Sequence, residues 1–263
     1  MSNKTDSNSY TIIFAIVMVI VVGSLLAFTA SSLKPNIKEN ERMEKQQNIL
    51  YAMGVNENEE GSITFISTEK VAEAFSTKIS EQIVLEVKDG KILKEMNRDE
   101  FMAANNNKEP YLIDIKKQQT RAKNGKSRFL PLFKGQQEGN TVYVAPIRGN
   151  GLWDAIWGYV ALDTDMIIKG VFFDHAGETP GLGANIKQRY FMDDFIGEHL
   201  LDSEGNFKGI TVAKGNNDPK NEEKTDYEVD AIAGATITGD GVSAMIKSDL
   251  KLYMPYFKNL NSK

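Results

Sequence analysis

The 263-residue chain contains no cysteine and only two histidines, His175 and His199. Without cysteine it cannot form disulfides, cysteine-ligated zinc sites, iron–sulfur clusters or thioether-linked haem. Two histidines are too few for a histidine-rich metal site, and the pair His175 and Glu178 supplies only two ligands where zinc takes three or four. We therefore expect no metal site, and any electron transfer by this chain needs an organic cofactor.

The sequence also has little net charge. Its 31 Lys and Arg residues against 36 Asp and Glu residues give a formal net charge of −5. Proteins that bind nucleic acid usually carry a basic face or a high isoelectric point. We therefore expect no nucleic-acid partner.

Common nucleotide-binding and catalytic motifs are missing. The segment Gly-Asn-Gly at 149–151 has no third glycine at the dinucleotide-binding spacing, and no loop ends in Gly-Lys-Ser/Thr. The segment around Ser243 lacks the last glycine of a serine-hydrolase nucleophile elbow. The sequence thus argues against a dinucleotide site, a P-loop and a serine hydrolase.

One long apolar run is present near the N-terminus. No charged residue occurs between Asp6 and Lys34, and the core of this stretch, 12–30, is almost wholly apolar. A helix needs roughly 20 residues to cross a bilayer core. We predict a membrane anchor in residues 1–33, with the span at about 11–33.

The alternative for this run is a cleaved signal peptide, with small residues at 30–32 as the cleavage site. Against it, the run is longer than the usual apolar region of about 7–15 residues. The preceding residues carry only Lys4 and the terminal amine, offset by Asp6. A retained anchor is the better interpretation.

The charges behind the apolar run leave the orientation of the anchor open. Basic residues would place the following domain in the cytoplasm, but acidic residues alternate with them and long domains translocate largely regardless of flanking charge. The residues concerned are Lys34, Lys38, Glu39, Glu41, Arg42, Glu44 and Lys45.

Behind the anchor the pattern predicts the α+β class, with an N-terminal elaboration at 34–140 and a second segment at 141–263. Residues 38–53 are typical of a surface helix, 54–61 of a turn-rich break and 68–80 of another helix. The pattern of apolar and polar residues is weak at 101–140 and becomes sharper from residue 141.

Residues 83–96 alternate apolar and polar side chains around Asp89-Gly90, which is a strong hairpin signal. Residues 101–140 are weakly patterned, although 127–135 is apolar. The predicted elements after residue 140 are strands at 141–147, 155–163 and 166–174, a helix at 186–200, a strand at 209–215, a polar loop at 216–225, a strand and small-residue turn at 229–236, and a helix at 241–254.

Two tight segments of small and polar residues precede predicted helices, at 177–184 and 233–238. Backbone N–H groups at a helix N-terminus favour an anion such as phosphate, and small residues let a ligand approach the backbone. The simpler alternative is a turn closed by a capping side chain, Thr179 in the first segment or Thr238 in the second. Patterning alone leaves both interpretations open.

Together these segments resemble the FMN-binding domain shared by the C subunit of the Na⁺-translocating NADH:quinone oxidoreductase and the G subunit of the Rnf electron-transport complex. The family pattern Asp-x-x-Ser/Thr-Gly-Ala-Thr occurs at 230–236, with Ala233 replacing the first hydroxyl residue. Its companion Glu-Thr-Pro-Gly-Leu-Gly occurs at 178–183, and the glycine–tryptophan loop at 149–153. With the anchor, the resemblance covers the whole chain.

The resemblance implies a covalent cofactor. In the family, FMN is joined through its phosphate to the hydroxyl of the last threonine of the motif, which is Thr236 here, by a flavin transferase that uses FAD. Thr238 is the alternative acceptor. The other cofactor-binding residues implied are Gly234, Ala235, Thr238, Glu178, Thr179, Leu182, Gly183, Trp153 and Lys214.

Two of these residues have structural alternatives. Trp153 packs either near the isoalloxazine ring or in the protein core. Lys214 contacts either phosphate or flavin, or is a solvated charge at a strand end.

The function implied is electron relay by a membrane-anchored flavoprotein subunit, without a catalytic acid or base of its own. Its partners would be the other membrane and flavin subunits of the complex, with NADH and quinone bound elsewhere. By resemblance it lies in the bacterial inner membrane with its soluble domain in the periplasm.

Two other functions stay open. The nearer one is the G subunit of the Rnf complex, whose members tend to be shorter in the region corresponding to 38–140. From a different class, a membrane-anchored sensory or binding module would carry no cofactor.

Overall fold

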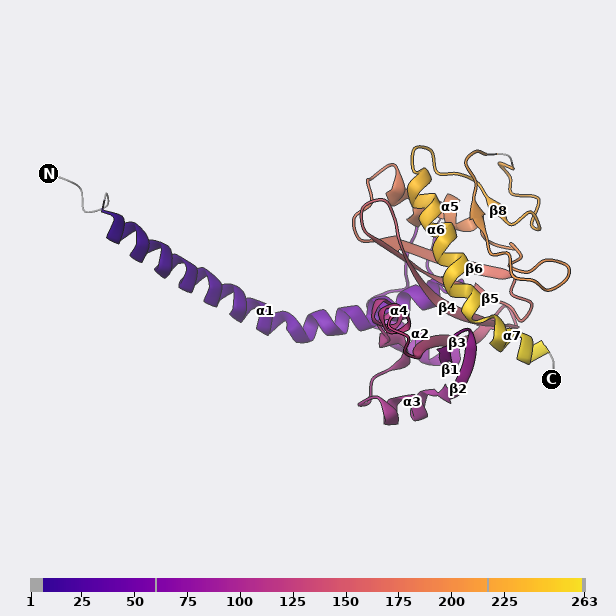
Figure 1. The fold of residues 1–263 in the computed structure, drawn as a ribbon, viewed down its shortest axis with the longest axis horizontal. Helices are drawn as coiled ribbons and strands as arrows, with labels where there is room; N and C mark the ends of the chain where they lie inside the picture. The colour runs from indigo at the N-terminus through magenta and orange to yellow at the C-terminus, as the bar shows by residue number, and fades with distance from the viewer. Residues whose placement is uncertain (1–6, 60, 217, 262–263) are drawn as a thin grey trace. The chain divides into compact units, whose positions relative to one another are not determined.

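The computed structural model of the chain describes residues 7–59, 61–216 and 218–261 (Figure 1). It divides into two compact units, Met1–Glu44 and Lys45–Lys263. Helix α1 (Asn8–Ala52) forms the described part of the first unit and contributes its last turns to the second.

In the first unit, α1 exposes large apolar side chains along its whole predicted span. By length and composition it is able to cross a membrane. The helix predicted at 11–33 is therefore confirmed as a helix. Its exposed apolar residues include Ile12, Ile13, Phe14, Val19, Ile20, Leu25, Leu26 and Phe28.

The last turns of α1 correct one prediction, because they are not a surface helix. Ile49, Leu50 and Ala52 are fully buried. A Cβ at Gly170 would collide with the carbonyl oxygen of Ala52, so this glycine allows the helix end to lie against the sheet. Polar residues in the stretch hid its burial from the sequence pattern.

The second unit is built on one six-stranded antiparallel sheet in the order β2-β1-β3-β4-β5-β6. This confirms the α+β class, and strands from both predicted segments share the sheet. The strands are β1 (Ile79–Lys88), β2 (Lys91–Asn97), β3 (Arg128–Gln137), β4 (Asn140–Asn150), β5 (Ala155–Leu162) and β6 (Ile168–His175).

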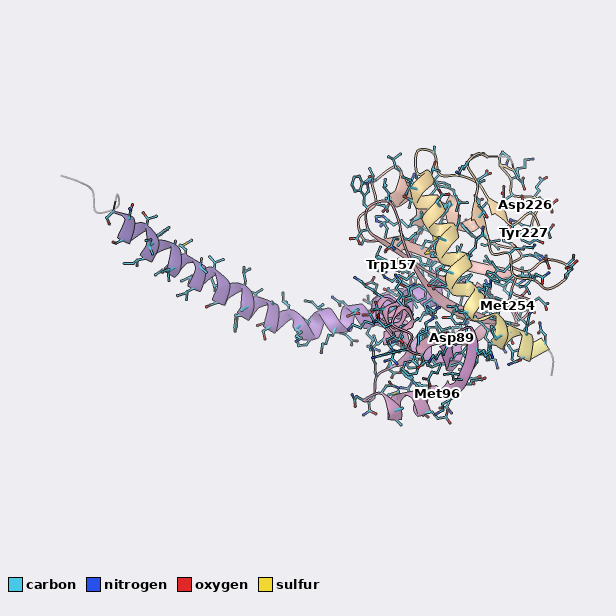
Figure 2. The ribbon with its side chains drawn as sticks, viewed as in Figure 1. Asp89, Met96, Trp157, Asp226, Tyr227 and Met254 are labelled. Atoms are coloured by element: carbon cyan, nitrogen blue, oxygen red, sulfur yellow. The ribbon has the colours of Figure 1, made fainter. Side chains whose placement is uncertain are left out.

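The predicted hairpin is confirmed, with Lys88 paired to Lys91 across a two-residue turn. Asp89 and Gly90 have φ angles of 49° and 73°, the left-handed values that this turn requires. Figure 2 labels Asp89 in this turn and Met96 on β2. Met96 packs in a small cluster of buried residues with Val84, Phe101 and Ile113.

The predictions missed β3 as a strand and noted only an apolar segment. Pro131 lies within β3 opposite Val84, and proline argues against a central strand because it donates no ladder hydrogen bond. The pairing of β3 with β4 covers only Phe133 to Gln137, so Pro131 lies outside it. Helices α2 (Thr68–Lys78), α3 (Arg98–Ala104) and α4 (Ile115–Lys123) and the 3₁₀ turn η2 (Pro110–Leu112) complete this half.

The two faces of the sheet are covered by different ends of the chain. Along β4, Val142 and Val144 point to the face that carries the end of α1, since Val142 pairs with Gly135 and a Cβ there would meet Met53. Gly149 points to the other face, where a Cβ would lie 2.8 Å from the Cβ of Met245. Figure 1 shows the helix that carries Met245, α6 (Thr236–Asp249), running across this face.

The predicted helix at 186–200 is wrong as one element. The structure has a 3₁₀ turn η3 (Gly183–Lys187) and a short helix α5 (Arg189–Asp193). Gln188 between them is extended, with ψ of 146°, and Gly197 has a φ of 90°. The aromatic stripe that suggested a helix is nonetheless buried in Phe191 and Phe195.

The C-terminal elements are shorter or earlier than predicted. The strands at 209–215 and 229–236 shrink to a parallel pair, β7 (Thr211–Val212) and β8 (Glu228–Val229). Helix α6 begins at Thr236 instead of residue 241, and is followed by η4 (Leu250–Leu252) and α7 (Met254–Asn261). Its glycines, which disfavour a helix, are needed for packing, since a Cβ at Gly241 would collide with the carbonyl oxygen of Asn150.

Candidate cofactor site

A surface pocket of about 250 Å³ lies at the N-terminus of α6. All predicted site residues except Trp153 and Lys214 line it, although they come from segments far apart in the sequence. The lining residues are Leu152, Glu178, Thr179, Leu182, Gly183, Gly234, Ala235, Thr236, Ile237 and Thr238.

Thr236 is the first residue of α6 and is exposed. The preceding N-cap position holds Ala235, and no side chain in the described part of the chain caps the helix. The first N–H groups of a helix have no partner within it. They leave positive charge beside the Thr236 hydroxyl, where an anionic group is favoured.

Gly234 shapes the turn that leads into this helix. Its φ is 70°, and a Cβ there would lie 2.9 Å from Cδ2 of Leu182. A side chain at this position would therefore be strained by its backbone and crowd the opposite wall of the pocket. Glycine is required here for the acceptor turn to approach Leu182.

Thr238 lies on the same turn of α6 but in a different environment. Its side chain is buried, with 1% exposure. The hydroxyl donates a hydrogen bond of 2.6 Å to Oε2 of Glu178. Of the two candidate acceptors, only Thr236 therefore presents an exposed side chain. Thr238 also does not cap the helix.

Glu178 is buried and engaged on both carboxylate oxygens. Oε1 accepts from the backbone amide of Trp153 at 2.9 Å and from that of Asp154 at 3.4 Å. Burial raises the pKa of Glu178, but the hydrogen bonds from Thr238 and the backbone amides outweigh burial, so the net pKa is lowered from 4.5. The group therefore stays ionised at neutral pH. Its own amide donates to Nδ1 of His175 at 3.2 Å.

Trp153 is not a core residue, because its side chain is 69% exposed. Its indole Nε1 donates to the Thr179 hydroxyl oxygen at 3.2 Å, which holds it near the pocket. Leu152 and Ile237 line the pocket and are about half exposed, yet the sequence predictions missed them. Leu152 lies in the glycine–tryptophan loop and Ile237 directly follows the threonine motif, but exposure of an apolar side chain has no signature in the sequence.

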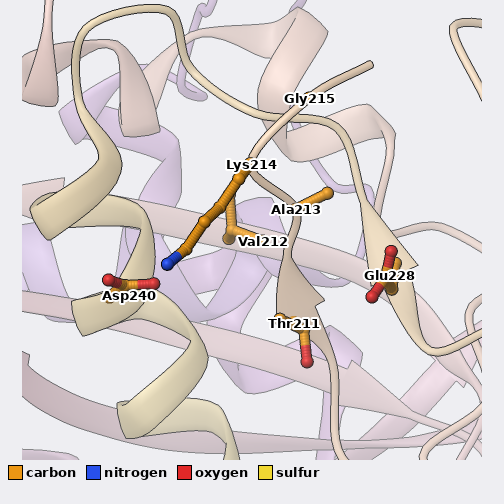
Figure 3. Close-up of a pocket in the computed structure, with 7 residues that line it drawn as sticks. All are labelled: Thr211, Val212, Ala213, Lys214, Gly215, Glu228 and Asp240. Carbon is orange, nitrogen blue, oxygen red and sulfur yellow. The ribbon is translucent and has the colours of Figure 1, made fainter. Parts of the chain in front are cut away.

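Lys214 lies in a separate and larger pocket of about 560 Å³. Figure 3 shows its ammonium group pointing toward the carboxylate of Asp240 on α6. Asp240 follows Thr236 by one helical turn, so the two pockets lie along the same helix. The residues around Lys214 are Thr211, Val212, Ala213, Gly215, Glu228 and Asp240.

Asp230, the first residue of the threonine motif, also lies outside the Thr236 pocket. With Asp218 and Asp226 it borders a cavity of about 20 Å³. Burial, followed by the charge of Asp218, raises its pKa. The nearby Asp194 has its pKa raised to about 6, first by burial and then by Asp230.

Comparison with known proteins shows what this chain is similar to. Residues 151–251 match the family profile of the FMN-binding domain. The C subunit of the Na⁺-translocating NADH-quinone reductase of Pseudomonas aeruginosa is 28% identical over 253 residues, covering 94% of this chain and 92% of that protein. The corresponding C subunit of Neisseria meningitidis serogroup A is 28% identical over 271 residues, covering 100% and 98%. Over nearly its full length the chain is similar to these C subunits.

Solved structures agree. The crystal structure of the C subunit from Parabacteroides distasonis superposes with a TM-score of 0.65 at 28% identity, covering 86% of this chain and 96% of that one. The Shewanella oneidensis NqrC structure, at 24% identity and a TM-score of 0.60, shows the same fold. The resemblance to the C-subunit family is confirmed, and the segment 151–251 that matches the FMN-binding domain contains the 178–183 loop, Thr236 and all of α6.

Proposed function

We propose that this chain is the FMN-carrying C subunit of a Na⁺-translocating NADH:quinone oxidoreductase, with FMN joined as a phosphoester to Thr236. The observation that carries the attachment is an exposed threonine at the uncapped start of α6. It lies within the segment that matches the FMN-binding domain. When bound, FMN supplies one-electron transfer between redox partners.

The attachment requires a hydroxyl that a transferase can reach. In the proposed step, Oγ1 of Thr236 forms a bond to the flavin-side phosphorus of FAD, and the bond from that phosphorus to the AMP oxygen breaks. AMP leaves, and the hydroxyl proton passes to a base of the separate transferase. Ala233, where the family pattern has Ser or Thr, takes no part in this exchange.

The chain's own residues would bind and orient the attached group. The first N–H groups of α6 would stabilise the phosphoester charge, because no lysine or arginine of the described chain lines this pocket. Thr179, Leu182 and Gly183 would line the ribityl chain, and Trp153 would pack near the ring. Lys214 is proposed to contact the cofactor only from the neighbouring pocket.

Helix α1 is proposed to anchor the subunit in the bacterial inner membrane, with the second unit in the periplasm. NADH and quinone would bind on other subunits of the complex, since the sequence shows no dinucleotide loop here. Protease treatment of spheroplasts should digest residues 45–263 from outside. Protection of these residues would contradict the orientation.

Mass spectrometry of the 226–247 peptide tests the attachment directly. Co-expression with a flavin transferase should add one FMN group to Thr236 and give a band that fluoresces after denaturation. Thr236→Ala should abolish both signals. The matched control Thr225→Ala changes an exposed threonine outside the pocket and should retain them.

Two results would contradict the proposal. A non-fluorescent wild-type band would favour a cofactor-free binding module, and a fluorescent Thr236→Ala band would move the attachment elsewhere. The nearly full-length match to C-subunit relatives favours this complex over the Rnf type. Co-purification with Na⁺-dependent NADH:quinone activity would test that choice.

A further inference from the structure

Glu178 occupies an unusual place in the site, because its carboxylate joins three separate parts of the chain. It follows β6, accepts hydrogen bonds from the loop between β4 and β5, and accepts one from the first turn of α6. We propose that Glu178 is a positioning residue that fixes the acceptor turn for flavin attachment and does not itself contact the flavin. This proposal rests on the proposed attachment of FMN to Thr236.

Although Glu178 lines the pocket, its carboxylate is buried and bonded within the chain. Glu178 is 4% exposed. A Cβ at Gly151 would lie 2.5 Å from its Oε1, and a Cβ at Gly183 would lie 2.5 Å from the Thr238 hydroxyl and collide with Oε2. Two glycines thus create the space that the carboxylate fills, and the chain itself uses both oxygens.

The hydrogen bond between Glu178 and Thr238 also restrains Thr236, because the helix backbone connects the two threonines. Both residues belong to the first turn of α6, whose N-cap Ala235 has no side-chain oxygen. A helix start without a cap tends to fray. The hydrogen bond from Thr238 to Glu178 restrains this turn from the buried side, so it sets the direction in which Thr236 points.

The same hydrogen bond also makes the two threonine hydroxyls chemically different. Thr238 uses its hydroxyl hydrogen on Glu178 and faces inward, whereas Thr236 is exposed. Glu178 therefore also directs modification to Thr236. Its negative charge is not needed for this role, and beside a phosphoester it would be mildly repulsive.

Glutamine and leucine at position 178 should have different effects. Glutamine can accept from the Trp153 amide through its oxygen and donate to the Thr238 hydroxyl through its nitrogen, because a hydroxyl both donates and accepts. Leucine has a similar size but leaves the Trp153 amide and the Thr238 hydroxyl without a partner. The proposal expects Glu178→Gln to preserve attachment and Glu178→Leu to lose it.

The experiment measures the initial rate of FMN incorporation at Thr236 in the full-length chain, with purified transferase and FAD. We expect Glu178→Leu to fall about tenfold or more, and Glu178→Gln to stay within about twofold of wild type. The exposed Glu222→Leu is the matched control and should react like wild type. Backbone hydrogen exchange at residues 236–239 should be faster in Glu178→Leu than in wild type, and unchanged in Glu178→Gln and Glu222→Leu.

A second variant covers the case in which Glu178→Leu does not fold, as judged by circular dichroism. Thr238→Val removes only the bond to α6 and should slow incorporation severalfold. The proposal is overturned if folded Glu178→Leu or Thr238→Val reacts at the wild-type rate. It is also overturned if Glu178→Gln is as slow as Glu178→Leu. A wild-type chain that takes up no FMN would instead refute the attachment to Thr236 itself.

Discussion

Replacement of Gly234 by alanine tests the geometry of the acceptor turn. The φ of Gly234 is 70°, and left-handed backbone costs an L-residue about 1–2 kcal/mol. Alanine also restricts the unfolded chain, which returns about 0.4–1 kcal/mol to the folded state. The net expectation is a loss of about 1 kcal/mol, to which the 2.9 Å approach to Leu182 adds.

Gly205 provides a matched control, because it isolates the backbone strain. Its φ is 75°, and nothing lies within 4 Å of a Cβ placed there. Gly205→Ala should therefore lose about 1 kcal/mol of stability, and its flavin incorporation should not change. Gly234→Ala should lose at least as much stability, and its flavin incorporation should fall.

Urea unfolding, followed by circular dichroism on the full-length chain, measures these differences. For a domain of this size a loss of 1 kcal/mol corresponds to a melting temperature lower by about 2–4 °C. The reasoning is refuted if Gly234→Ala is as stable as wild type while Gly205→Ala is not. It is also refuted if both variants incorporate flavin equally.

Two further predictions concern buried charge and the exposed indole. Burial raises the pKa of Glu198 to about 7; the charge of Asp226 adds to this increase, and the charge of Lys224 opposes it. Between pH 4.5 and 7 the native state therefore holds a proton that the unfolded state has lost. The contribution of Glu198 to the free energy of unfolding should be fully present below pH 4.5 and should fall by up to roughly 3 kcal/mol as the pH rises through 7. The Glu198→Gln variant should lose this pH dependence, and a urea midpoint that still varies with pH as in wild type would disprove the prediction. Attached flavin should quench the fluorescence of Trp153. The difference in tryptophan fluorescence between the flavin-free and flavin-loaded protein should therefore be much smaller in Trp153→Phe. A difference as large as in wild type would place the flavin ring away from Thr179.

Much of the fold could be predicted from local patterns. Short apolar runs separated by turn residues located β4, β5 and β6, and the Asp89-Gly90 pair located the first hairpin. These signals work because a short apolar run and a left-handed turn are properties of neighbouring residues. They needed no knowledge of the rest of the chain.

The failures share a different cause. The stretch 186–200 has helical spacing of apolar residues, but tertiary packing buries Ile186 from η3, Phe191 from α5 and Phe195 from the turn after α5, and the extended Gln188 interrupts the helix. Helix α6 starts at a run of β-branched residues and glycines with low helix propensity. Contacts such as Gly239 against Val212 stabilise it there, and such contacts are invisible along the sequence.

The absence of cysteine, the apolar N-terminal run and the two short motifs were enough to indicate an anchored chain with an FMN-binding domain and to single out 230–238. Each of these is a matter of composition or local spacing. The tertiary structure decided which threonine is exposed, and it placed Lys214 in a pocket apart from Thr236. It also paired Glu178 with Thr238, because a hydrogen bond between residues 60 positions apart exists only once the sheet and α6 have packed together.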